Sequence, residues 1–139
     1  MKNVFITENN IISPLGFTSE TNILQIAQEK SGITLHDNMG FSPYYASIID
    51  DEIFNDSFNK IGDIDAYTKL EKMMILSLQD TISQADFSIT DRTALLIATT
   101  KGNIDALDTN TTKFTPERAY LPVLGEKIKT FFNFKNEPI

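Results

Sequence analysis

Few side chains in this sequence are of the types that act as nucleophiles, bases or metal ligands. There is no cysteine, which excludes a disulfide framework, a thiolate nucleophile and a thiolate metal site. The one histidine, His36, would have to serve any Ser-His-Asp arrangement, yet it lies in a polar stretch with two glycines, residues 31–40. We therefore interpret His36 as a surface loop residue rather than a catalytic one.

The remaining polar motifs are better explained by local structure than by catalysis. The carboxylates of residues 50–52 and 63–65 stand near expected helix starts, where capping accounts for them. The polar turn at residues 99–102 lacks the glycine-rich spacing of a phosphate-binding loop, and no Gly-x-Gly-x-x-Gly occurs. A metal site would need spaced histidines or cysteines beside the carboxylates. We expect no catalytic, cofactor-binding or metal-binding residues and no cofactor.

Composition indicates one ordinary globular domain over residues 1–139, with 41% hydrophobic and 22% charged residues. The net charge of −7 argues against nucleic acid as the main partner, because binding to a nucleic-acid backbone needs clustered Lys and Arg. No apolar run approaches the ~20 residues of a membrane span, and Met1-Lys2-Asn3 leads into Val4 without a signal peptide. We expect a cytoplasmic protein that does not contact a membrane.

The apolar run Thr93–Ala98 organises the expected fold. It is apolar at nearly every position and lies between helical segments, which favours a strand covered on both faces in an α/β sheet. Residues 4–7 and 44–49 are further expected strands, Pro138-Ile139 would begin another, and residues 33–41 would form a loop.

Helical spacing and caps predict four helices. The first follows Thr18 or Ser19, carries an apolar face and ends at Ser31-Gly32; the second is short and ends near Gly62. The strongest spans 65–85, with an apolar stripe wide enough to be contacted on two sides and a Met pair that we assign to the core. The last places Pro122 in its first turn, after a helix start at residues 115–117. The expected buried faces are Ile23, Leu24, Ile26 and Ala27; Ile53, Phe54 and Phe58; Ala66, Leu70, Met73, Met74, Leu78, Ile82 and Ala85; and Leu124, Ile128, Phe131 and Phe132.

Several of these segments, in order, resemble the amino-terminal part of a β-ketoacyl-(acyl carrier protein) synthase. Residues 4–7 followed by 11–16 (IISPLG) resemble the opening strand and turn of that family, and residues 30–33 (KSGI) resemble the end of its first helix. Residues 67–86 resemble its long helix, and residues 92–102 (RTALLIATTKG) its second core strand. One departure is Glu8-Asn9-Asn10, where many members carry Gly-x-Gly.

The resemblance implies a thiolase-like fold, of which this chain would form an incomplete amino-terminal part: a partly parallel sheet with helices on both faces. Members use a cysteine and two histidines to condense an acyl thioester with malonyl-(acyl carrier protein), usually as dimers. The cysteine follows the strand that Pro138-Ile139 would begin, and the histidines come from the second half. We therefore expect a chain without the catalytic residues, inactive alone, that forms homo- or hetero-oligomers.

Two other interpretations remain open at this point. The chain could be a stand-alone, non-catalytic module that pairs with a full synthase or an acyl carrier protein, although carrier proteins are acidic and the charge of −7 disfavours direct docking. It could also be an unrelated α/β domain whose motif matches are accidental.

Overall fold

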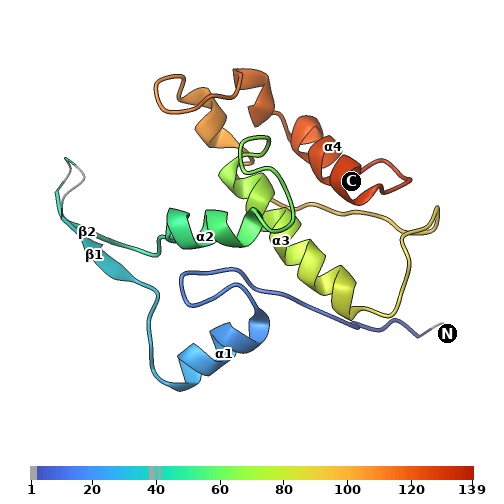
Figure 1. The fold of residues 1–139 in the computed structure, drawn as a ribbon, viewed down its shortest axis with the longest axis horizontal. Coiled ribbons are helices and arrows are strands. Elements are labelled where there is room, and N and C mark those ends of the chain that lie inside the picture. The colour runs from blue at the N-terminus through green and yellow to red at the C-terminus, as the bar shows by residue number, and fades with distance from the viewer. Residues whose placement is uncertain (1–2, 38–39, 41) are drawn as a thin grey trace. The chain divides into compact units, whose positions relative to one another are not determined.

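The computed structural model describes residues 3–37, 40 and 42–139. Its contacts divide the chain into two compact units, the first formed by Met1–Gly62 with Leu76–Ala85 and the second by Asp63–Ile75 with Asp86–Ile139. The helices and strands in chain order are α1 (Ser19–Ala27), β1 (Thr34–His36), β2 (Tyr44–Ala46), α2 (Asp51–Phe58), α3 (Lys69–Gln84), the 3-10 helices η1 (Ile104–Leu107) and η2 (Pro116–Ala119), and α4 (Leu121–Phe132) (Figure 1). None of the helices in this described part is long and apolar enough to cross a bilayer.

The first unit contains an antiparallel pair, β1 and β2, in which Leu35 lies opposite Tyr45. The predicted strand of residues 44–49 begins at Tyr44 as expected but ends at Ala46, and the prediction of a loop over residues 33–41 is wrong where β1 lies. Three residues of that expected loop, Asn38, Met39 and Phe41, are outside the described residues, as are Met1 and Lys2. A strand of three residues is too short to show a recognisable hydrophobic alternation in the sequence. It is stabilised by contacts with the strand that it pairs with.

Residues 9–22 of the first unit form a turn fastened by the amide of Asn22. This buried side chain donates from Nδ2 to the carbonyl oxygens of Ile11 (3.1 Å), Gly16 (2.9 Å) and Thr18 (2.8 Å), and its Oδ1 accepts from the Ser13 hydroxyl. Gly16 has φ +154°, and a Cβ there would lie 2.4 Å from Thr21 Cγ2, so this turn requires glycine.

The caps of α1 and α2 are those that the sequence predicts, but the buried face of α1 is not. Thr18 accepts the Thr21 N–H at 3.1 Å, and Asp50 accepts the Ile53 N–H at 3.0 Å. In α2, Phe54 and Phe58 are fully buried as predicted, but Ile53, expected on the same buried face, is 61% exposed. On α1 the expected core residues are exposed: Ile23, Leu24 and Ile26, at 62%, 54% and 62%. Asn22 is the buried side chain of α1, and its amide donates the hydrogen bonds that hold the turn of residues 9–22 together.

Helix α1 ends at Ala27, before the predicted Ser31-Gly32, in a left-handed turn occupied by Glu29. The Lys30 N–H donates to Gln25 O (3.1 Å) and the Glu29 N–H to Ile26 O (2.9 Å), the two bonds of a Schellman motif. A residue with a Cβ is strained at the Glu29 φ of 59°.

Replacing Glu29 with glycine is expected to raise the free energy of unfolding by about 0.5–1 kcal/mol, because glycine adopts this conformation without strain. Urea denaturation measures the change. Asn133→Gly is the matched control: Asn133 ends α4 in the same conformation, at φ 58°, and asparagine tolerates it. An equal gain at both positions would contradict relief of strain as the cause.

Helix α4 begins at its predicted proline, whereas α3, whose residues belong to both units, does not begin at the predicted carboxylates of residues 63–65. Helix α3 begins at Lys69, four residues later than predicted, so Ala66 of the expected buried face lies outside the helix and is exposed. None of the residues from Lys69 to Ile82 is exposed, as the wide apolar stripe indicates. Its most buried side chains are Glu71, Lys72 and Ile75, and both methionines are half-buried. Helix α4 has Pro122 in its first turn, as predicted, and buries Leu124 and Ile128.

The two principal expected strands, residues 4–7 and 93–98, are not strands in the described structure. Residues 93–98 nevertheless make ladder-type hydrogen bonds to the other end of the unit. The Ile97 N–H donates to Ile139 O and the Ile139 N–H donates to Leu95 O, both at 2.9 Å. Ile139 thus forms hydrogen bonds with the residues on either side of Leu96, which is the pattern of a parallel strand pair. Helix α4 lies between the two paired segments in the sequence.

Candidate functional site

His36, the one candidate for base catalysis, lies on the β1–β2 hairpin. Its Nε2 is 3.1 Å from Thr34 Oγ1, and its ring stacks on Tyr44 with centroids 5.5 Å apart. It is therefore a strand residue rather than a loop residue. Its described contacts, with Thr34 and Tyr44 of the same hairpin, give His36 a role in packing the hairpin.

The acidic clusters also have local roles. Asp50 caps α2, and Asp51 and Glu52 stand in its first turn. Asp63 accepts the backbone N–H of Asp65 at 2.8 Å, so it fixes a turn before α3 and does not cap the helix. Asp65 pairs with Lys113, and the hydrogen bond from that ammonium holds the pKa of Asp65 below its usual value. No group of three metal-ligating side chains occurs among residues 3–37, 40 and 42–139.

The polar turn at residues 99–102 forms as expected. The Gly102 N–H donates to Thr99 Oγ1 at 3.1 Å, and Gly102 has φ +57°. Glycine is favoured at position 102 because this left-handed conformation strains residues that carry a Cβ. The turn connects the extended segment to η1 and presents no cluster of backbone donors.

The most elaborate polar cluster of the second unit was not predicted from the sequence. Glu71 is completely buried at the start of α3, and Arg118 of η2 is 12% exposed. Arg118 Nε donates to Glu71 Oε1 (2.7 Å) and its Nη2 to Glu71 Oε2 (2.6 Å), so the ion pair is bidentate. Arg118 Nη2 also donates to the Ala66 carbonyl at 2.8 Å.

Asn103 and Thr68 complete this cluster. Asn103 Nδ2 donates to Glu71 Oε1 (2.8 Å) and Arg118 O (3.1 Å), and Asn103 Oδ1 accepts from the Thr68 hydroxyl at 2.7 Å. Thr68 and Glu71 form a capping box: the Glu71 N–H donates to Thr68 Oγ1 (3.2 Å) and the Thr68 N–H to Glu71 Oε2 (3.0 Å). We call Thr68, Glu71, Asn103 and Arg118 the buried polar cluster.

The buried polar cluster stabilises the fold and does not have the features of a catalytic site. Every acceptor of Glu71 is already engaged, and no buried side-chain nitrogen or oxygen in the described part of the chain lacks a hydrogen-bond partner. A catalytic carboxylate needs a free lone pair facing a substrate. The Thr-x-x-Glu spacing at residues 68–71 is a sequence signal for the capping box, whereas nothing local identifies Arg118 or Asn103 as its partners.

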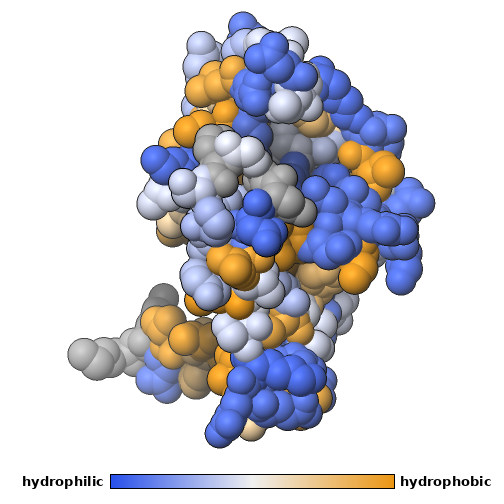
Figure 2. Space-filling model, turned by 90° about the vertical axis from the view of Figure 1, so that its left-hand side faces the viewer, coloured by the Kyte–Doolittle hydropathy of each residue, from blue (hydrophilic) through white to orange (hydrophobic). Residues whose placement is uncertain are grey.

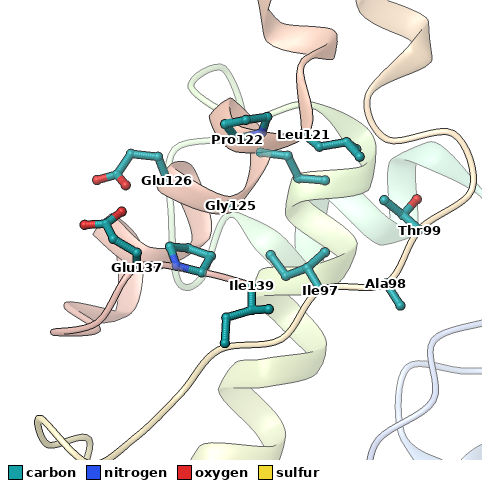
Figure 3. A pocket seen from close by; sticks show the side chains of 11 residues that line it. Ile97, Ala98, Thr99, Leu121, Pro122, Gly125, Glu126, Glu137 and Ile139 are labelled. Carbon is teal, nitrogen blue, oxygen red and sulfur yellow. The ribbon is translucent and has the colours of Figure 1, made fainter.

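A pocket of about 470 Å³ lies beside α4 in the second unit. It is lined mainly by apolar residues from the extended segment, from α4 and from the chain end: Ile97, Ala98, Leu121, Pro122, Leu124, Gly125, Pro138 and Ile139. Figure 3 shows Leu121 and Pro122 facing Ile97 and Ile139 across it. The polar lining residues are Thr99, Glu126 and Glu137. This size and lining suit a small apolar ligand.

Charge in this pocket is confined to one end. Glu126 and Glu137 lie together there, and Thr99 lies at the opposite end (Figure 3). Lys129, one turn along α4, donates to Glu137 Oε1 (2.5 Å) and Glu126 Oε2 (3.3 Å). The hydrogen bond to Glu137 is the main cause that raises the pKa of Lys129 above its usual value. Two carboxylates against one ammonium leave one formal negative charge at this end.

Comparison of the chain with protein-family models, with curated proteins and with solved structures finds no match.

Proposed function

We propose that this chain is the amino-terminal portion of a β-ketoacyl-(acyl carrier protein) synthase-like protein with a thiolase-like fold, and that it carries none of the catalytic residues. The whole protein would extend acyl chains by decarboxylative condensation in the cytoplasm, with an acyl carrier protein as partner. The proposal is based on the ordered motifs of residues 4–16, 30–33, 67–86 and 92–102.

One structural observation supports this proposal more than the others. The extended residues 95–97, helix α4 and the extended Ile139 follow one another in the chain, and their two 2.9 Å hydrogen bonds have the parallel pattern. An extended segment, a helix and a second extended segment parallel to the first make up the βαβ arrangement on which α/β sheets are built. That arrangement is the one that the resemblance implies for this part of the chain.

The purified chain is expected to show no condensation of an acyl thioester with malonyl-(acyl carrier protein), because a thiolate nucleophile is absent. Release of carbon dioxide and formation of the β-ketoacyl product measure this, with an intact synthase as positive control. Condensation by the purified chain itself would overturn the assignment of the catalytic residues to another part of the protein.

A stand-alone, non-catalytic module is the second candidate, favoured by the separate buried cores of the two units, which include Phe54 and Phe58 in one and Leu124 and Ile128 in the other. The reading frame after the Ile139 codon distinguishes the candidates. A continuation that encodes a strand and a cysteine-bearing turn supports a synthase portion, and a stop codon at that point supports the module.

We further propose that the chain associates with itself or with another subunit through exposed apolar residues. Hydrophobic residues interrupt the hydrophilic surface on the face shown in Figure 2. Val4 and Ile6 are 94% and 93% exposed on an extended segment, and Leu96 is 70% exposed. Large apolar side chains that are this exposed can be covered when subunits associate. Sedimentation velocity at rising protein concentration tests this: a constant monomer value would contradict it.

A further inference from the structure

We propose that the pocket beside α4 binds a small amphipathic cation, of the class of a primary alkylammonium. This site belongs to the second unit alone and does not depend on the proposed family. Its volume of about 470 Å³ falls within the range of small-molecule sites, and most of its lining is aliphatic. An alkyl chain placed between Leu121 and Ile97 would remove apolar surface from water on both sides.

The charge at one end of the pocket favours a ligand with a cationic head group. The charged lining residues are Glu126 and Glu137, and none of the lining residues is cationic. Lys129 occupies part of their hydrogen-bonding capacity, but its bond to Glu126 is long, at 3.3 Å, and the Glu126 side chain is 54% exposed. An incoming ammonium can therefore bind Glu126 while Lys129 keeps Glu137. A carboxylate ligand would meet repulsion at the same place.

The opposite end of the pocket offers a ligand no competing charge. Thr99 is its polar residue there, and the Thr99 hydroxyl oxygen already accepts the Gly102 N–H. An amphipathic cation is thus oriented in one way, with its alkyl chain toward Leu121 and its ammonium at Glu126.

The test is an NMR titration of the ¹⁵N-labelled full chain with three probes of equal chain length: n-octylammonium, octan-1-ol and octanoate. Shifts of the Ile97, Leu121 and Gly125 amides report occupancy of the pocket. Octylammonium is expected to bind about fivefold more tightly than octanoate, with octanol between them, as befits partly exposed ion pairs. Equal affinities for the three probes, or no shifts at these amides, would overturn the proposal.

Charge variants separate selection by the two carboxylates from simple apolar binding. The double substitution Glu126→Gln with Glu137→Gln is expected to reduce the preference for octylammonium over octanoate to less than twofold. Lys129→Met removes the internal competitor and is expected to raise the affinity for octylammonium severalfold relative to octanol. Glu117→Gln, at an exposed carboxylate outside the pocket lining, is the control and should leave the preference unchanged.

A salt titration of the unchanged protein keeps the proposal testable if the double variant does not fold. Raising the salt concentration from about 0.01 M to about 1 M shortens the screening length and is expected to remove most of the preference for octylammonium. A preference that persists in high salt, or that survives in the folded double variant, would show that the carboxylates do not select the ligand.

Discussion

Replacing Glu71 with glutamine is expected to lower the free energy of unfolding by about 3–5 kcal/mol. The substitution keeps the size of the side chain but removes the charge that neutralises Arg118, which is only 12% exposed and pairs with both oxygens of a completely buried Glu71. The glutamine NH₂ group would also face donors of Arg118 or Asn103 in place of an acceptor. Urea denaturation followed by circular dichroism measures the loss.

A surface ion pair provides the control for Glu71. Asp65 pairs with Lys113 in the same unit, but its side chain is 78% exposed, so Asp65→Asn should leave the stability nearly unchanged. Combining Glu71→Gln with Arg118→Met should cost less than the two single losses added together, because each substitution breaks the same pair. Strictly additive losses, or a Glu71→Gln loss as small as that of Asp65→Asn, would show that the buried pair does not stabilise the fold.

Truncating Phe54 to alanine is expected to lower the free energy of unfolding by about 3–5 kcal/mol, through lost burial and the cavity left behind. Phe54 has no exposed surface, and its ring packs edge-on against Phe17, with centroids 5.6 Å apart. Ile53→Ala is the matched control: it lies next to Phe54 on α2 but is 61% exposed, and should cost well under 1 kcal/mol.

Thermal and chemical denaturation should agree on the order of these two variants. A loss at Ile53 as large as that at Phe54 would mean that the face of α2 that contains Ile53 is also covered in solution, for example by another subunit. Comparing the variants at several protein concentrations would identify that case, since stabilisation by association depends on concentration.

The sequence predicted the elements whose causes are local. The start of α2 follows from the Asp50 cap and that of α4 from Pro122 in its first turn, and both residues act within one turn of the helix. The apolar face of α1 was predicted wrongly because helical spacing says which residues share a face, not whether that face is covered.

The sequence did not correctly predict the features that depend on residues far apart in the chain. A strand needs a neighbour, and within the described part of the chain residues 93–98 are paired in this way through two hydrogen bonds to Ile139. Arg118 lies 47 residues and Asn103 32 residues from Glu71 in the sequence, so no short pattern joins them. The pocket beside α4 likewise combines three separated segments, and its carboxylates have no motif.

The capping box at Thr68 and Glu71 has an effect beyond the second unit. It determines the residue at which α3 begins, and the same continuous helix supplies Leu76–Gln84 to the first unit. The Thr68 and Glu71 side chains provide partners for backbone N–H groups that the first turn of a helix leaves without one, so losing the box would favour fraying of α3 from that end. Residues of both units therefore belong to a helix whose first turn depends on one buried carboxylate.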